Sequence, residues 1–434
     1  MKILIESSSP LTNLGDEAIL SANIQVLKDL LRGCEILVLS PKPEKTSKVH
    51  NVLSKANFMT LIGKWGRFQG RLKVIWLGLR LLWNAKRLRK RSTLKLLNDG
   101  EADFLKNFSS CDAFLIVGGG NLSDIAPWGG LFSRSVEILL AKIFGKPVFL
   151  GAQTVGPLRK KWAKMLVRFA LEKADLITLR ECYSYLLLRS IGIKNPILKV
   201  VPDDAFGINS ISQQKAIYLL SKEDVDFRKL VKNKMIKVGL NVRPWWKKRG
   251  IKRIKNELLE TIRFLIKDKR FYLIFFPTAY GEYQKGYNDV KGAKELSRYL
   301  SVSKDRVKIL ENEYTPQEIK GILNLLDIII TISYHPAVFA MSMAVPTIGL
   351  YEDEYYRMKL LGLFKMMRVE EFAIDITKTN SMEVCTKINK LLECRNETKE
   401  KLGIESKKIE KDVCFAAKQL INHLESRLSD EIRK

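Results

Sequence analysis

Short apolar runs alternate with amphipathic stretches of helix length through most of the chain, and they form two series. The first series has strand-like runs at 2–6, 35–39, 112–117, 147–151, 176–179 and 198–201, with helical stretches near 16–31, 130–145, 159–173 and 181–191. The second series has strand-like runs at 237–242, 271–276, 307–310, 327–332 and 347–350. Such alternation is typical of parallel sheets covered by helices. The sequence therefore predicts an α/β protein with two Rossmann-like domains.

The length of 434 residues leaves room for two domains. We expect an N-terminal domain over 1–206, a polar and irregular linker over 207–234 and a C-terminal domain over 235–395. Helices are expected over 396–434, and one of them should cross back over the first domain. Ligands of open α/β sheets bind beyond the carboxyl ends of the strands, so the cleft between the domains is the expected place of a functional site.

The composition excludes several classes of protein. Hydrophobic residues make up 46% and charged residues 28%, which is not typical of a disordered chain. The six cysteines form no CxxC pair, so we expect no disulfide framework. No His, Asp and Cys cluster has ligand spacing, so the sequence offers no candidate metal ligands and the need for a metal stays open. No apolar run reaches the ~18–20 residues that cross a bilayer, and the N-terminal run is shorter than a signal-peptide core. We therefore expect a cytoplasmic protein.

The net charge of +28 predicts an anionic partner. Half of this excess lies in an insertion of the first domain, residues 45–98, which holds fourteen Lys or Arg and no acidic residue. Within it an apolar face flanked by basic residues recurs at helical spacing. The face consists of Phe68, Leu72, Ile75, Trp76, Leu79 and Trp83, whereas Val74, Leu77 and Leu81 lie off it.

Two interpretations of this basic helix stay open. A basic helix with tryptophans is typical of a protein that lies on an anionic membrane surface, here through residues 64–95. Alternatively, it is an ordinary helix packed inside its domain, with a solvated basic tail. Nucleic acid is not an expected partner, because no RNP, zinc-finger or recognition-helix pattern is present.

Two glycine turns follow strands of the first series. At the first, Asn13 and Asp16 flank Gly15 and are candidates to hold the hydroxyl groups of a sugar, although an acidic residue there also suits the dipole of the following helix. At the second, glycines without side chains would let a ligand approach the backbone closely. Alternatively, the segment is a turn that binds no ligand. Its candidate residues are Gly119, Gly120 and Asn121. The second turn lacks GxGxxG spacing, so a nicotinamide cofactor is not expected.

Two motifs of the second series carry candidate anion-binding groups. Arg243 and Lys247 follow the strand at 237–242. The guanidinium of Arg243 can donate two parallel hydrogen bonds to the oxygens of a phosphate or carboxylate. Alternatively, Arg243 forms a surface ion pair. His335 and Pro336 open an apolar helix after the strand at 327–332, and the amide groups of its first turn form a ready anion site. A histidine at this position can donate a proton near neutral pH, although a lone histidine is more often structural.

These stretches together resemble the polysaccharide pyruvyl transferase family. The resemblance rests on seven motifs in order: NLGDEAIL at 13–20, FLIVGGG at 114–120, GAQTVGP at 151–157, TLRE at 178–181, VPDDAF at 201–206, VGLNVRPW at 238–245, and SYHP with AVPTI at 333–348. It implies a glycosyltransferase-B-type (GT-B) fold with an N-terminal acceptor domain and a C-terminal donor domain. It also implies transfer of a pyruvyl group from phosphoenolpyruvate to a sugar, as a ketal, without a further cofactor.

The resemblance also implies roles for residues at the matching positions. His335 would donate a proton to the donor or stabilise the leaving phosphate. The donor would be bound by Arg243, Lys247, Ser333 and Tyr334. The acceptor would be positioned, or deprotonated, by Asp16 or Asp203, beside Asn13, Gly119, Gly120 and Asn121. Ser333 stands where the family often has an arginine, so Arg243, Lys247 or a basic residue from elsewhere must meet the donor's phosphate.

Two other functions stay open. A glycosyltransferase that uses a nucleotide sugar shares the fold and the histidine, but it commonly holds the ribose through a glutamate where this chain has Phe339. An apolar ring cannot accept those hydrogen bonds. A non-catalytic protein would bind membranes or nucleic acid through its charge alone. The basic segment also suits a lipid-linked oligosaccharide as acceptor, presented at the inner face of the cytoplasmic membrane.

Overall fold

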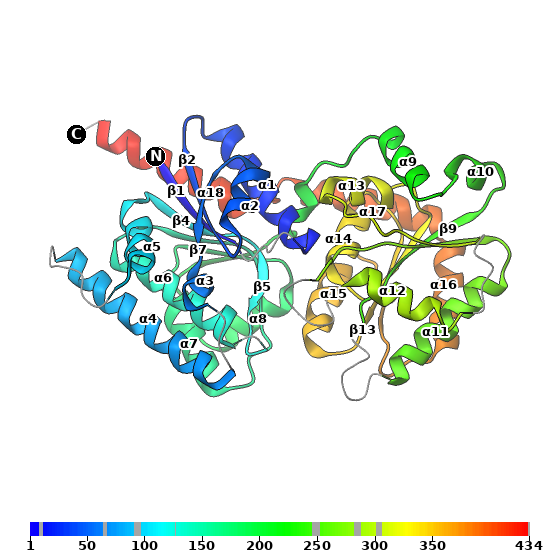
Figure 1. Cartoon of the computed structure of the whole chain (residues 1–434), viewed down its shortest axis with the longest axis horizontal. Coiled ribbons are helices and arrows are strands. Elements are labelled where there is room, and N and C mark those ends of the chain that lie inside the picture. Colours follow the sequence, from blue (N-terminus) through cyan, green and yellow to red (C-terminus); the bar gives the residue numbers. More distant parts are fainter. Residues whose placement is uncertain are drawn as a thin grey trace. The chain divides into compact units, whose positions relative to one another are not determined.

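The computed structural model describes residues 1–7, 12–63, 67–90, 97–125, 127–244, 252–281, 288–300 and 306–432 (Figure 1). The chain divides into two compact units. The N-terminal unit comprises Met1–Leu11, Ile19–Asp204 and Asp412–Lys434. The C-terminal unit comprises Thr12–Ala18 and Ala205–Lys411. The short segment Thr12–Ala18 therefore folds with the second unit, although the sequence analysis placed it in the first domain.

The N-terminal unit is built on a parallel sheet with strand order β3-β2-β1-β4-β6-β7-β8, and β5 pairs with β6 beside this path. The strands are β1 (Lys2–Glu6), β2 (Glu35–Ser40), β3 (Leu53–Ala56), β4 (Ala113–Ile116), β5 (Gly119–Leu122), β6 (Val148–Val155), β7 (Leu176–Leu179) and β8 (Ile197–Val200). The helices are α1 (Leu14–Leu30, which starts in the other unit), α2 (Pro43–His50), α3 (Phe58–Ile62), α4 (Arg67–Arg89), α5 (Asp99–Ser110), α6 (Ser133–Ile143), α7 (Lys161–Leu171), α8 (Cys182–Ser190) and α18 (Phe415–Ile432). A π-helix, η1 (Pro127–Phe132), precedes α6.

The strands predicted for this unit are present, because each central strand is buried on both faces and therefore reads as an apolar run. Two strands were missed. β3 is an edge strand whose residues are only partly buried, so it leaves no apolar run. β5 contains Gly119, Gly120 and Asn121, which the sequence analysis took for a turn, but the segment pairs with β6.

The C-terminal unit has a second parallel sheet with strand order β11-β10-β9-β12-β13-β14. Its strands are β9 (Ile236–Asn241), β10 (Phe271–Phe275), β11 (Val307–Ile309), β12 (Ile328–Thr331), β13 (Thr347–Tyr351) and β14 (Ala373–Asp375). Its helices are α9 (Gln213–Lys222), α10 (Phe227–Lys232), α11 (Lys252–Lys267), α12 (Asp289–Ser297), α13 (Pro316–Leu323), α14 (Tyr334–Ser342), α15 (Glu354–Met366), α16 (Ser381–Glu393) and α17 (Arg395–Glu410). Two parallel α/β sheets confirm the predicted fold class.

The stretch 207–234, predicted to be an irregular linker, contains helices α9 and α10 instead. Ser212 caps α9 by accepting a hydrogen bond from the backbone N–H of Lys215, and Asp226 caps α10 in the same way from Lys229. Both helices bury only a few residues on one side, so their sequences are largely polar. That polarity suggested a loop, although the caps were readable signals of helix starts.

Helix α4 lies in the basic insertion and packs against α6. Its buried face consists of Val74, Leu77, Leu81 and Ala85. At Gly78 the two segments approach closely, because an added Cβ would lie 2.8 Å from the ring of Phe132 and 3.0 Å from Val136. The opposite stripe is exposed and consists of Leu72, Trp76, Leu79 and Trp83. The helix is therefore part of its domain, as one interpretation predicted, and still presents an apolar stripe outward.

Of the two other predicted members of that apolar face, Ile75 is half-buried and the side chain of Phe68 lies outside the described residues. Residues 64–66 and 91–95 of the predicted membrane segment also lie outside them. Arg80 of α4 forms an ion pair with Glu101 of α5. Within the described part of the chain, no helix has the length and apolarity needed to span a membrane.

The C-terminal helix α18 contacts β4, β6 and β7 of the N-terminal unit, and a buried carboxylate fixes its start. Asp204 accepts hydrogen bonds from the backbone N–H of Cys414 and from Asn23 Nδ2, both at 2.9 Å. Burial raises the pKa of Asp204 to about 7. Asp204 is therefore protonated more readily in the folded chain than in the unfolded chain.

This pKa predicts a pH dependence of stability. A carboxyl group whose pKa is higher in the folded state binds more protons there, so the free energy of unfolding should fall as the pH rises from about 4 to about 7 and then level off. At about 1.4 kcal/mol for each pKa unit, Asp204 should contribute roughly 4 kcal/mol to this fall. In the Asp204→Asn variant the side chain at position 204 is neutral at every pH. Much of the fall in the free energy of unfolding should therefore be absent from this variant.

Urea unfolding of both proteins at pH 5 and pH 8, followed by tryptophan fluorescence, measures the difference. All other titrating groups are common to the two proteins, so their contributions cancel in the comparison. Equal pH dependence of the two unfolding midpoints would show that Asp204 does not titrate in this range.

Candidate functional site

The turn that follows β1 is built onto the C-terminal unit. Asn13 forms an antiparallel bridge with Ala279, and the backbone N–H of Leu14 donates to the carbonyl of Thr278 at 2.9 Å. Within the turn, the backbone N–H of Gly15 donates to Asn13 Oδ1 at 3.1 Å, and Asn13 Nδ2 donates to Asp16 Oδ2 at 2.9 Å. These contacts hold Asn13 and Asp16 beside the segment that follows β10.

The same turn lies directly against His335, the second residue of α14. A Cβ added to Gly15 would lie 1.8 Å from Nδ1 and 1.9 Å from Cγ of His335, so the imidazole occupies the space that any larger residue at position 15 would need. His335 is 8% exposed. The structure therefore brings together His335, Asn13, Gly15 and Asp16, which the sequence analysis had singled out separately.

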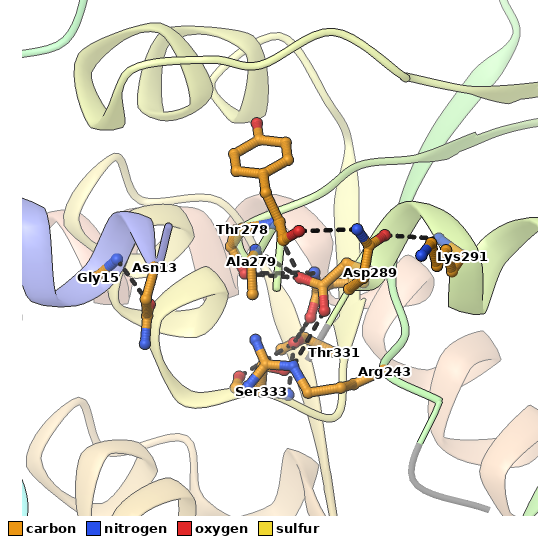
Figure 2. Close-up of polar contacts among 12 residues, drawn as sticks. Asn13, Gly15, Arg243, Thr278, Ala279, Asp289, Lys291, Thr331 and Ser333 are labelled. Atoms are coloured by element: carbon orange, nitrogen blue, oxygen red, sulfur yellow. Dashed lines mark hydrogen bonds and ion pairs between the residues drawn. The ribbon is translucent and has the colours of Figure 1, made fainter. Parts of the chain in front are cut away.

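Asp289, the first residue of α12, organises the polar groups around this site (Figure 2). Its Oδ2 accepts hydrogen bonds from the backbone N–H groups of Thr278 (2.9 Å) and Ala279 (3.0 Å) and from Asn241 Nδ2 (3.0 Å). Its Oδ1 accepts from Arg243 Nε at 3.0 Å. This buried carboxylate thereby fixes the orientation of the Arg243 guanidinium, which is itself buried.

Ser333 precedes α14 and occupies the N-cap position, but its hydroxyl makes no capping hydrogen bond. Its backbone N–H donates to Thr331 Oγ1 at 2.9 Å, and that hydroxyl donates to the Ser333 carbonyl at 3.0 Å. Ser333 is 3% exposed and its Oγ has no hydrogen-bond partner among the described residues. Figure 2 shows the Arg243 guanidinium directed toward Ser333. A helix N-terminus, a buried hydroxyl and a guanidinium can together bind an anion.

Tyr334 follows Ser333 and is buried against a lysine that the sequence analysis missed. The Lys359 Nζ of α15 lies 5.1 Å from the centroid of the Tyr334 ring, and the rings of Tyr355 and Tyr356 also face it at 4.5 and 5.4 Å. Aromatic faces stabilise a buried ammonium group in this way. Lys247, the other predicted donor ligand, lies outside the described residues.

The predicted acceptor residues Gly119, Gly120, Asn121 and Asp203 lie in the N-terminal unit. Asp203 is buried, and its carboxylate forms a 2.6 Å ion pair with Arg180, whose Nε donates to Thr154 Oγ1 at 2.7 Å. β5 is also closely packed, because a Cβ on Gly130 would lie 2.2 Å from the carbonyl oxygen of Asn121. A sugar contact by these residues stays a prediction.

A second group of buried charges lies at the carboxyl end of β1. Arg134 of α6 contacts Glu6 and Glu137, with nitrogen–oxygen distances of 2.6 Å to each. Burial raises the pKa of Glu6 and of Glu137 above the ordinary glutamate range. No sequence pattern indicates this cluster, because Glu6 lies at the end of an apolar run and Arg134 and Glu137 lie inside an amphipathic helix. Among the described residues, no group of His, Cys, Asp and Glu is arranged to hold a metal ion.

Known proteins share both the sequence pattern and the fold. Residues 13–354 match the sequence profile of the family described as polysaccharide pyruvyl transferase. The amylovoran biosynthesis protein AmsJ of Erwinia amylovora is 25% identical over 430 residues, which cover 93% of this chain and 95% of that protein.

Solved structures with the same fold include the S. aureus MnaA–UDP co-structure, with a TM-score of 0.59, 13% identity and coverage of 99% of this chain and 97% of that one. The UDP-GlcNAc 2-epimerase of Neisseria meningitidis bound to UDP-GlcNAc has a TM-score of 0.57 and 14% identity, with coverage of 98% and 100%. These similarities establish a fold of the GT-B type. The chain therefore belongs to the polysaccharide pyruvyl transferase family and is a transferase of polysaccharide biosynthesis.

Proposed function

We propose that the protein transfers a pyruvyl group from phosphoenolpyruvate to a sugar of a cell-surface polysaccharide or its lipid-linked precursor. Protonation of the donor's methylene carbon makes C2 electrophilic, and a sugar hydroxyl adds there and loses its proton. Phosphate then leaves with the C–O bonding electrons, and a second hydroxyl adds to C2 and loses its proton, which closes the ketal. One observation supports this proposal most directly: His335 is packed against the Asn13–Asp16 turn beside an uncapped helix N-terminus.

Each described group has a part in this chemistry. His335 donates the proton or stabilises the leaving phosphate, and the amide groups at the start of α14 bind an anionic end of the donor together with Arg243. Asp16, held by Asn13, orients the acceptor hydroxyl or accepts its proton. Lys359 supplies a cation close to the position where the family often has an arginine, because its ammonium faces Tyr334, the neighbour of Ser333.

A nucleotide-sugar glycosyltransferase is the second candidate, because solved structures with this fold include complexes with UDP. Phe339 argues against it. This side chain is fully buried and its ring centroid lies 6.4 Å from that of His335, in the place where such enzymes commonly hold the ribose. A purely non-catalytic role does not suit a member of a transferase family.

The donor can be identified by thermal unfolding. A ligand at 100 times its dissociation constant stabilises the native state by about 2.7 kcal/mol, which corresponds to a rise of several degrees in the melting temperature of a unit of this size. Phosphoenolpyruvate should produce this rise, whereas UDP-glucose and UDP-GlcNAc should not. A rise with a nucleotide sugar and none with phosphoenolpyruvate would reverse the assignment.

The acceptor is proposed to be carried on a lipid at the inner face of the cytoplasmic membrane. The exposed stripe of α4 supports this location, because Trp76 and Trp83 flank aliphatic side chains on a helix without acidic residues. Such a helix can lie in the headgroup layer of an anionic membrane.

A further inference from the structure

Helix α7 presents a second apolar stripe on the N-terminal unit, one that the sequence analysis did not single out. Trp162, Met165 and Phe169 are 38%, 71% and 57% exposed. Their spacing of three and four residues places them on one face of the helix. Ala163, Val167 and Ala170 form its buried face. Three neighbouring exposed apolar side chains on one helix face form a contiguous patch, which is typical of an interaction site.

The stripe of α7 is surrounded by cations. The exposed basic residues in and beside the helix are Arg159, Lys160, Lys161, Lys164, Arg168 and Lys173. The acidic residue Glu172 accepts hydrogen bonds from the backbone N–H groups of Lys194 and Asn195, so its carboxylate is engaged in holding a loop. Lys173 Nζ lies 5.0 Å from the Phe169 ring centroid. Apolar and basic groups are therefore interleaved, as on α4.

Aromatic contacts join α7 to α4. The indole of Trp162 stacks on Trp128 of η1, with ring centroids 5.6 Å apart and planes at 16°. Trp128 packs on Phe132 at 6.0 Å, and Phe132 is the ring that contacts α4 at Gly78. Both helices also contact α6, and Figure 1 shows α4, α6 and α7 grouped in the N-terminal unit.

We infer that α4 and α7 together form one surface that binds an anionic lipid bilayer. This inference deepens the proposed function, on which it rests, from a single helix to a two-helix surface. The aliphatic side chains Leu72, Leu79 and Met165 favour hydrocarbon over a nucleic-acid backbone, with which they have no favourable contact. A second copy of the chain would bring two cationic faces together, which is repulsive. Each basic residue near an anionic surface adds about fivefold in affinity.

Flotation with lipid vesicles tests this surface. The purified full-length protein should float with vesicles of phosphatidylcholine containing phosphatidylglycerol, should bind pure phosphatidylcholine at least tenfold more weakly, and should lose affinity as salt rises. Met165→Glu with Phe169→Glu should weaken binding to the anionic vesicles by about tenfold or more, since each glutamate removes an apolar contact and adds a repelled charge. Leu72→Glu with Leu79→Glu should have a similar effect.

The matched control places two glutamates on exposed apolar positions of the C-terminal unit, Met382 and Ile404, which are 77% and 48% exposed. It should bind vesicles within about twofold of the wild type. The inference is overturned if the α7 variant floats like the wild type, or if the control loses as much affinity. It is also overturned if the wild type binds an oligonucleotide or forms dimers while failing to float.

Flotation requires neither donor nor sugar, so its outcome is independent of the proposed reaction. The α7 variant should keep the rise in melting temperature with phosphoenolpyruvate. Loss of flotation with that rise intact supports the two-helix surface whatever the acceptor is. Absence of the rise in the wild type counts against the proposed donor and leaves the vesicle result standing.

Discussion

Replacing His335 by alanine should lower turnover with phosphoenolpyruvate by ~10² or more, the usual size of general acid–base assistance. The structure gives the reason for this expectation. The imidazole lies at the start of α14 and is packed against the Gly15 turn. A group fixed in that position can transfer a proton or meet departing phosphate without rearrangement.

Phosphate release with a purified acceptor measures the effect, and the melting temperature reports whether the fold survives. His423→Ala is the matched control, because that histidine lies in the N-terminal unit against Phe149. It should leave turnover close to the wild-type value. If His335→Ala turns over donor at nearly the wild-type rate with an intact fold, His335 has no part in the chemistry. Loss of one limb of the pH–rate profile in His335→Gln would distinguish proton transfer from packing.

Gly15→Ala should reduce turnover about as much as the loss of the histidine itself. The added methyl group would lie 1.9 Å from Cγ of His335. Because Cγ is bonded directly to Cβ, a small rotation of the ring cannot relieve the clash. The imidazole must leave its position, or the turn must move. Overpacking of this kind also costs about 1–3 kcal/mol, so the melting temperature should fall.

A double-mutant cycle tests whether the effect of Gly15→Ala depends on the His335 side chain. In the His335→Ala background the space beside Gly15 is open, so Gly15→Ala should cost little further activity or stability. Gly100→Ala is the control, since a Cβ there makes only ordinary contacts, the nearest being 3.5 Å from Asn98. Additive losses in the cycle would show that position 15 acts independently of the imidazole.

The sequence predicted the strands well, because buried parallel strands leave apolar runs that can be read without knowledge of the fold. It also singled out both partners of the central contact, Gly15 and His335, from their places after strands. It did not predict that they touch, because 320 positions separate them and no local pattern encodes such a distance.

Asp289 and Lys359 were missed for a related reason. Asp289 lies at a helix start, where an acidic residue has an adequate local explanation, and its partners lie on two other segments, at residues 241–243 and 278–279. Lys359 looks like a surface residue of a charged helix until the three tyrosines around it are known. For α4, apolar residues occur on both sides, so the sequence alone could not say which side packs inward.

The division of the chain between its units has a consequence for biosynthesis. The N-terminal unit draws on residues 412–434, including the Cys414 N–H that Asp204 binds, and the C-terminal unit draws on residues 12–18. During translation the first unit therefore cannot be completed until the ribosome has passed residue 412. No single cut yields two self-sufficient halves, so fragments expressed separately would each lack a piece that the other carries.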